Sequence, residues 1–188
     1  MRSDVAALYV DPRGPYPKLV AEWFDEARDA RTYAGPWPVV AHPPCGPWGP
    51  MKHLCRKQDA SCGPHAVEVV RGCGGVLEHP YGSFLWRACH LPRPRELPDA
   101  WGGRSYEVRQ VAWGHACPKP TWLYVVGVPA RVVVDGIRVG GRATHRVTSG
   151  PRMATLPSAS RKVRTLTPPA FAAWLVELAS QVRKEVAA

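Results

Sequence analysis

The chain has 188 residues, 45% of them hydrophobic, and a formal net charge of +10, which suits one globular domain with a substantial core. It has no apolar run near the roughly 20 residues that a membrane span needs, and its first residues lack the apolar stretch of a signal peptide. Composition therefore argues against membrane and exported proteins, and we expect a cytoplasmic location. The six cysteines are then expected as reduced thiols or metal ligands rather than disulfides.

In chain order, short apolar runs bounded by proline and glycine alternate with segments of helical spacing. The apolar runs predict strands over 6–10, 38–41, 74–78, 106–112 and 121–126. Helical spacing predicts helices over 17–30, 64–71 and 83–89. This alternation is typical of an α/β domain with a mostly parallel sheet.

The last third of the chain is more basic. Residues 132–139 predict a hairpin on an Asp-Gly turn, and 140–166 show no clear period. Thr167 is expected to N-cap a final helix that has Pro168 at its first position. We therefore expect one α/β domain over 1–188, comprising a core over 1–130, a basic hairpin and loop region over 131–166 and a C-terminal helix over 167–186.

The run His42-Pro43-Pro44-Cys45 is the most informative motif. A predicted strand leads into it, and the two prolines restrict the backbone of the turn. A thiol presented at the carboxyl end of a strand is a candidate nucleophile, because α/β sheets bind ligands at that edge. A buried structural cysteine is the alternative.

Two later segments also place polar side chains near strand ends. Glu78 and His79 close the strand over 74–78, just before a proline. The other segment precedes the strand over 121–126 and contains Gln110, Trp113, His115 and Lys119.

In this order the three segments resemble the catalytic half of DNA cytosine-5 methyltransferases, over roughly residues 38 to 126. That family has a Pro-Pro-Cys nucleophile loop, a strand end with Glu-Asn-Val and a later Gln-centred segment with basic residues. The similar positions here are Pro43-Pro44-Cys45, Leu77-Glu78-His79-Pro80, and Gln110 with His115 and Lys119. The resemblance, to a shortened, phage-type relative, implies a truncated, methyltransferase-like (Rossmann-type) sheet followed by the C-terminal helix.

The resemblance implies DNA pyrimidine modification, most simply cytosine C5 methylation. The Cys45 thiolate would add to C6 and make C5 an enamine-like nucleophile; its pKa must then be lowered, and His42 is a neighbour that could do this. Glu78, if protonated or poised by burial, would hydrogen-bond N3 and the exocyclic amine. His79 replaces the family's Asn and is a further catalytic candidate. The substrate-binding candidates are Pro44, Trp48, Gln110, Trp113, His115 and Lys119, around a base flipped out of its duplex.

The resemblance also implies S-adenosylmethionine as the methyl donor. The family binds it on a glycine-rich loop after the first strand, where this chain has Asp11-Pro12-Arg13-Gly14-Pro15. Asp11 and Arg13 are the cofactor-binding candidates there, and hydrogen bonds within a turn are their alternative role.

Between Arg131 and Arg164 only Asp135 opposes the basic residues, which favours a polyanionic partner, with DNA the natural candidate. The nucleic-acid-binding candidates are Arg131, Arg138, Arg142, Arg146, Arg152, Arg161, Lys162 and Arg164. A solvated basic surface is the alternative.

Two other functions remain open. One is a non-catalytic nucleic-acid-binding protein, in which Trp48 or Trp113 would stack on bases. The other is a small zinc-binding Cys/His protein, for which the best local set of four ligands is His53, Cys55, Cys62 and His65.

Overall fold

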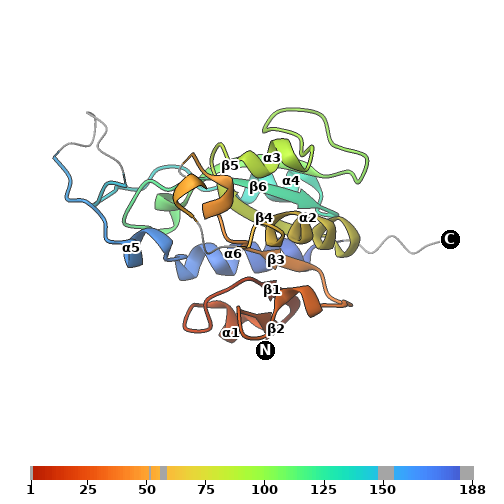
Figure 1. The fold of residues 1–188 in the computed structure, drawn as a ribbon. Helices are drawn as coiled ribbons and strands as arrows, with labels where there is room; N and C mark the ends of the chain where they lie inside the picture. The colour runs from red at the N-terminus through yellow and green to blue at the C-terminus, as the bar shows by residue number, and fades with distance from the viewer. Residues whose placement is uncertain (1, 51, 56–58, 148–154, 183–188) are drawn as a thin grey trace.

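A computed structural model describes residues 2–50, 52–55, 59–147 and 155–182 (Figure 1). The strands are β1 (Ser3–Leu8), β2 (Val20–Phe24), β3 (Val39–Ala41), β4 (Gly75–Pro80), β5 (Arg104–Arg109) and β6 (Pro120–Val126). The α-helices are α1 (Tyr16–Leu19), α2 (Cys62–Cys73), α3 (Phe84–Ala88), α4 (Ala130–Gly136), α5 (Arg161–Thr165) and α6 (Pro169–Ser180). Short 3-10 helices are η1 (Ala30–Thr32), η2 (Gly46–Trp48), η3 (Lys52–Leu54) and η4 (Gln110–Trp113). No described helix is long and apolar enough to cross a membrane.

The strands form one sheet in the order β2-β1-β3-β4-β6-β5. The first four strands in this order run parallel, whereas β6 is antiparallel to both of its neighbours. The expected α/β class and mostly parallel sheet are thus confirmed. The chain steps from β1 outward to β2 and returns to the other side of β1 as β3. Strand order therefore reverses between β1 and β3, and open α/β sheets bind ligands outside the carboxyl ends of strands at such a reversal.

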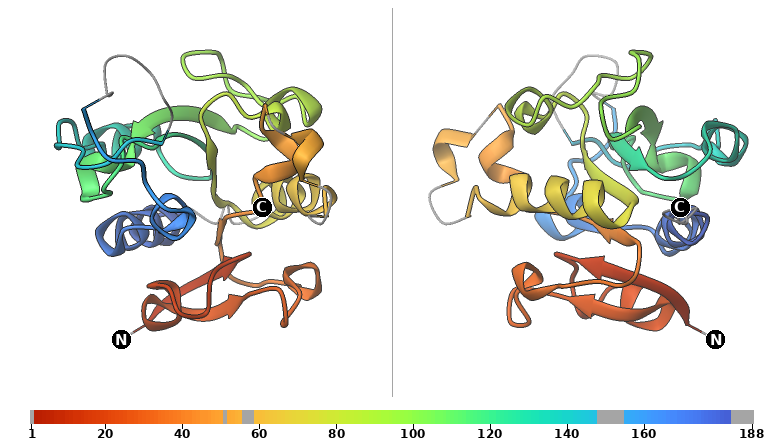
Figure 2. Two further views of the ribbon diagram at one scale, coloured as in Figure 1. Left: turned by 60° about the vertical axis from the view of Figure 1, so that its left-hand side comes forward. Right: turned by 90° about the vertical axis from the view of Figure 1, so that its right-hand side faces the viewer.

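Helices cover both faces of the sheet (Figure 2). Helix α2 packs on β3, β4 and β6, and α6 packs on β1, β3 and β4. In β1, Val5 and Ala7 belong to the hydrophobic cluster that includes α6 residues, while Ala6 and Leu8 belong to the cluster that includes α2 residues. All four are fully buried. Burial on both faces explains why the central strands are continuous apolar runs in the sequence.

The predicted C-terminal helix is confirmed as α6, although residues 183–186 of the expected range lie outside the described residues. The expectation that Thr167 caps it is wrong, because Pro168 occupies the N-cap position and the helix begins at Pro169. Trp174 of α6 stacks on Trp113 with 4.7 Å between ring centroids. Trp113 is only 4% exposed. The expectation that Trp113 stacks on a substrate base is therefore wrong, because its ring is part of the core.

The expected helix over 17–30 is also wrong. Only α1 is helical there, and the chain continues as β2, in which Trp23 pairs with Ala7 and Phe24 with Leu8 of β1. Valine and aromatic residues suit a strand, so pairing with β1 overrides the helical spacing of the apolar residues.

The hairpin expected over 132–139 is a helix instead. Pro129 precedes α4, and Val133 is fully buried against the core while Val134 is 57% exposed. Pro129 stands at the N-cap and the helix packs on α6, and this tertiary context overrides the strand preference of the β-branched residues. The strand expected over 106–112 forms two residues earlier as β5, and η4 follows it.

Gly75 provides a test of the close approach between β3 and β4. Its φ is 126°, and a Cβ there would overlap the backbone of Val39, its partner in the neighbouring strand. We expect Gly75→Ala to lower the free energy of unfolding by about 2 kcal/mol or more, because both the conformation and the contact exclude a side chain. Gly72→Ala is the matched control: it lies in α2 with open space around it, and should stabilise by up to about 1 kcal/mol. Equal effects in urea titrations would contradict this explanation.

Candidate active site

The three segments singled out in the sequence meet at the carboxyl edge of the parallel strands. The turn over 42–45 leaves β3 there, and Glu78 lies near the end of β4. Strand β6 is antiparallel and starts at the same edge, because Thr121 pairs with Pro80. The Gln110 backbone N–H donates to the carbonyl oxygen of Lys119 at 3.2 Å, which holds the third segment beside β6. Residues distant in sequence therefore lie close together beside the strand-order reversal.

A hydrogen-bonded network centred on Glu78 connects these segments. Glu78 Oε2 lies 2.8 Å from His42 Nδ1, and Glu78 Oε1 accepts from Gln110 Nε2 at 3.0 Å. Gln110 Nε2 also donates to Thr121 Oγ1 at 3.1 Å. The Tyr16 hydroxyl lies 2.5 Å from His42 Nε2. In a neutral His42, Nδ1–H donates to the carboxylate and Nε2 accepts from Tyr16, so both ring nitrogens are occupied.

Glu78 is ionised in this network. Burial by itself raises the pKa of the carboxyl group, because it disfavours the charged form. The hydrogen bond from His42 opposes burial, as do the charges of a protonated His42, of Lys119 and of a protonated His79, and the pKa falls to about 2. Glu78 therefore meets a ligand at neutral pH as a carboxylate that accepts hydrogen bonds, and the protonated form considered from the sequence is not the one present.

Cys45 is exposed at the tip of the turn and is the N-cap residue of η2, so it is not the buried structural cysteine considered above. Enough protein surrounds its sulfur that burial raises the pKa of the thiol, and the charge of Glu78 raises it further. Lys119 acts in the opposite direction. The expectation that His42 lowers the pKa of Cys45 is wrong, because both nitrogens of His42 are engaged with Glu78 and Tyr16.

His79 lies beneath the double-proline turn. It is 1% exposed, and its Nδ1 lies 2.7 Å from Ser83 Oγ. Burial lowers the pKa of its imidazole to about 4, although the nearby charge of Glu78 and the backbone of Pro43 and Pro44 oppose the shift. The ring is therefore neutral at pH 7. It also lines a cavity of about 30 Å³ beside Cys45, which has room for about one water molecule.

The other substrate-binding candidates divide into two groups. Pro44 and Trp48 flank Cys45 in the turn and η2, and Trp48 lines the same small cavity. Lys119 has a φ of 40° and donates through Nζ to the carbonyl oxygen of Leu166 at 2.8 Å. His115 is buried, and its Nδ1 accepts from the backbone N–H of Cys117 at 2.8 Å. Lys119 thus affects the site through its charge, which by itself lowers the pKa of Cys45. His115 instead stabilises its own loop through the hydrogen bond from Cys117.

The two cofactor-binding candidates make a local turn. Asp11 Oδ1 accepts from the backbone N–H of Arg13 at 2.9 Å and from its guanidinium Nε at 3.3 Å. Their side chains are 58% and 89% exposed, respectively. This is the turn role considered as the alternative. Tyr16, from the same connection, is 2% exposed and fills the space beside His42.

The basic tract extends from α4 to α5 and not over one compact patch; in Figure 1 these helices lie at opposite sides of the view. Six of its side chains are exposed: Arg131, Arg138, Arg142, Arg161, Lys162 and Arg164. Arg146 is half-buried. Arg152 lies outside the described residues.

The zinc-ligand candidates do not converge. His65 Nδ1 is 2.8 Å from the Tyr9 hydroxyl, and Cys62 lies with it on α2. His53 is on η3 and Cys55 follows it. Among the described residues, no group of three or more His, Cys, Asp or Glu side chains is placed to hold a metal ion.

Sequence reasoning missed three residues of the site. Tyr16 bonds to His42, Thr121 receives Gln110, and Ser83 contacts His79. For Tyr16 the available signal was a tyrosine between two prolines, just after the first strand. Thr121 and Ser83 have ordinary surroundings in the sequence, and only the strand order places them at the site.

The stability of the fold should depend on pH through His79. Its folded-state pKa is lowered, so its contribution is full above the unfolded pKa of about 6.5 and is lost as pH falls towards 4. When the pH falls from 7 to 5, the free energy of unfolding of the wild type should decrease by about 2 kcal/mol more than that of His79→Asn. The matched control is His53→Asn, at an exposed position, which should keep the wild-type slope. Parallel curves for wild type and His79→Asn would contradict the assignment.

The charges around Cys45 predict opposite effects of two substitutions on thiol reactivity. Glu78→Gln should speed alkylation of Cys45 by iodoacetamide, and Lys119→Met should slow it, each by up to about tenfold, since one pKa unit changes the thiolate fraction tenfold. Peptide mass spectrometry can follow the rates from pH 7 to pH 9. Cys89 is an internal control, because the charges that act on it come from Arg71 and Glu68. Shifts of the same sign in both variants would contradict the geometry.

No protein-family model, curated protein or solved structure matches this chain.

Proposed function

We propose that this chain modifies pyrimidines in DNA through addition of Cys45 to C6 of the base, with cytosine C5 methylation as the simplest net reaction. The observation that supports this most is the meeting of three segments at one sheet edge. They contribute the Cys45 thiol, the His42–Glu78 pair and the Gln110 donor. The reversal of strand order between β1 and β3 is the feature that a truncated, methyltransferase-like sheet would share with Rossmann-type folds.

The proposed reaction is a nucleophilic addition that one nearby charge assists. Addition of the Cys45 thiolate to C6 moves the C5–C6 electron pair onto C5, which then takes up a proton or another electrophile. Loss of the original C5 proton and expulsion of the thiolate restore the ring. Lys119 opposes the effect of Glu78 on the thiol and so favours the nucleophilic form.

The ionised Glu78 favours cytosine among the pyrimidines. Each carboxylate oxygen already accepts one hydrogen bond, from His42 or from Gln110, and each retains further acceptor capacity. The exocyclic amine of cytosine is a donor that fits this acceptor. Entry of a base requires side chains at the rim of the small cavity, such as the exposed Tyr81, to turn aside.

The connection after β1 does not fit S-adenosylmethionine. In cytosine-5 methyltransferases the loop after the first strand would bind the methyl donor. The described residues at this place in the chain are an exposed Asp11–Arg13 turn and a buried Tyr16. A side chain thus fills the space beside His42. We therefore propose the adduct chemistry of the base and derive no methyl-transfer step through these residues.

Hydrogen exchange at C5 tests the adduct without any donor. The enamine formed by Cys45 takes a deuteron at C5 in D₂O and loses the original proton, so cytosine in single-stranded DNA should gain one mass unit. We expect Cys45→Ala to reduce this exchange at least 100-fold, while Cys89→Ala, a cysteine outside the site, leaves it within about twofold. Nucleoside mass spectrometry measures the label. Equal labelling by wild type and Cys45→Ala would refute the proposed chemistry.

A non-catalytic nucleic-acid-binding function is the second candidate. The raised pKa of Cys45 favours it, because a mostly protonated thiol is a weak nucleophile at pH 7. DNA binding without C5 exchange at any pH between 7 and 9 would select this function over the enzyme.

A further inference from the structure

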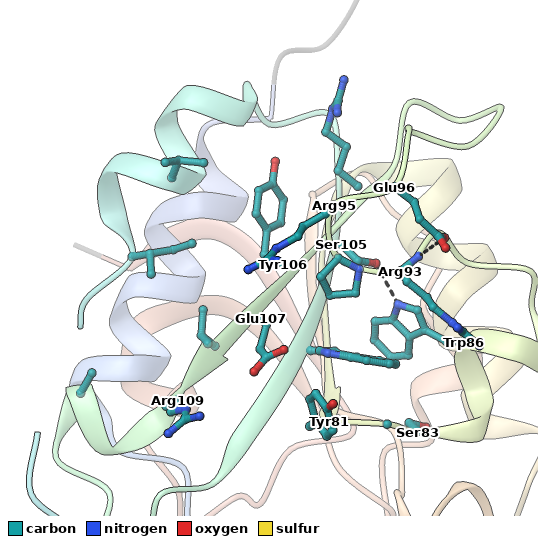
Figure 3. A pocket seen from close by; sticks show the side chains of 18 of the residues that line it. Tyr81, Ser83, Trp86, Arg93, Arg95, Glu96, Ser105, Tyr106, Glu107 and Arg109 are labelled. Atoms are coloured by element: carbon teal, nitrogen blue, oxygen red, sulfur yellow. Dashed lines mark hydrogen bonds between the residues drawn. The ribbon is translucent and has the colours of Figure 1, made fainter. Parts of the chain in front are cut away.

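A second, larger hollow lies beside the Tyr81–Ser83 segment (Figure 3). This groove has a volume of about 1290 Å³ and follows β5, the edge strand of the sheet. The loop over 93–96 and helix α3 border it, as do α4 and the residues after it. Of the basic residues between Arg131 and Arg164, Arg138 is the one in its lining.

The groove is strongly basic. Its arginines are Arg87, Arg93, Arg95, Arg104, Arg109 and Arg138, and all six are exposed. Its acidic residues are Glu96 and Glu107. Among the described residues, none of these arginines forms a salt bridge. Unpaired guanidinium groups concentrated in a hollow attract polyanions and offer bidentate donors for phosphate oxygens.

Aromatic rings line the end of the groove that is nearer Cys45. Tyr81 is 55% exposed and lies edge-on to Trp122, with 5.1 Å between ring centroids. The ring centroid of Trp86 lies 5.5 Å from that of Trp122, and the Trp86 indole N–H donates to Ser105 Oγ at 2.8 Å. Figure 3 shows Tyr81 and Tyr106 among the side chains that line the hollow. An exposed ring on a rigid aromatic base is a suitable platform for an unpaired base.

The groove borders the candidate active site. Tyr81, Gly82 and Ser83 line both the groove and the small cavity that contains Cys45 and His79. A strand lying in the groove would therefore bring its next nucleotide to the Tyr81–Ser83 segment, on whose other side the thiol lies once Tyr81 turns aside. A base must leave its stack before a side chain can attack C6, so a single strand fits this path better than a duplex.

We propose that the groove along β5 binds single-stranded DNA, with Arg104 and Arg109 contacting phosphates and Tyr81 stacking on a base next to the one held at Cys45. The placement of a base at Cys45 rests on the proposed function. Binding of the strand in the groove does not depend on it. Arg104 and Arg109 lie on opposite faces of the same edge strand, and both line the groove. A DNA strand that follows the open edge of β5 can therefore contact both.

Fluorescence anisotropy with a labelled 16-nucleotide single strand, between 50 and 200 mM salt, tests the proposal. Arg104→Gln/Arg109→Gln should weaken binding at least tenfold at 100 mM salt and reduce the slope of log K against log salt by about 1.4, since each phosphate contact to a single strand contributes about 0.7. Tyr81→Ala should weaken binding about five- to 100-fold with little change in slope. The matched control, Arg13→Gln/Arg28→Gln, removes the same charge from exposed positions near the opposite edge of the sheet and should change affinity less than twofold.

The outcomes separate the groove from the chemistry. Wild-type affinity in the groove double variant would overturn the proposal. So would equally tight binding of a duplex with the same dependence on Tyr81, or equal competition by poly-glutamate of matched charge. Cys45→Ala should bind the strand normally. If C5 exchange is absent but the groove variants behave as expected, the proposed function fails and the groove assignment stands.

Discussion

The buried, ionised carboxylate of Glu78 is the interaction on which the rest of the site depends. A buried charge costs several kcal/mol unless partners compensate it, and here the donors come from His42 after β3 and Gln110 after β5, with Tyr16 supporting His42. A single charge therefore fixes the relative positions of elements that are distant in sequence. The double-proline turn, the β4 terminus and the η4 segment can share one edge because each contributes to satisfying this carboxylate.

The same carboxylate disfavours ionisation of the Cys45 thiol. Glu78 disfavours the thiolate of Cys45, and Lys119 offsets only part of that effect. In the proposed reaction, a base whose amine donates to Glu78 spreads this negative charge. The charge of Glu78 would then disfavour the thiolate of Cys45 less when the base is bound than when the site is empty. A thiol whose pKa is raised in this way stays mostly protonated at pH 7 and so resists oxidation.

Sequence patterns predicted much of the fold and part of the site. Apolar runs bounded by proline and glycine located β3, β4 and β6, and they placed Cys45 at a strand end. The helix expected over 17–30 failed because β2 pairs with β1, a contact that the spacing of its own apolar residues does not reveal. The valines before Asp135 were taken for a strand because their one-sided burial depends on α6. The positions of Tyr16 and Thr121 in the site follow from the strand order, which the sequence does not reveal. The predicted zinc ligands are close in sequence, but among the described residues they do not form a metal-binding group.

Helix α6 has a consequence for how the protein is made. It covers the face of β1, β3 and β4 that includes Val5, Ala7 and Val40, yet it is the last described helix in the chain. A growing polypeptide exposes this face until α6 has left the ribosome, because α6 is the described helix that packs on it across all three strands. Contacts this distant in sequence slow folding and leave apolar surface open to aggregation. Completion of the core on these three strands therefore waits until α6 has emerged.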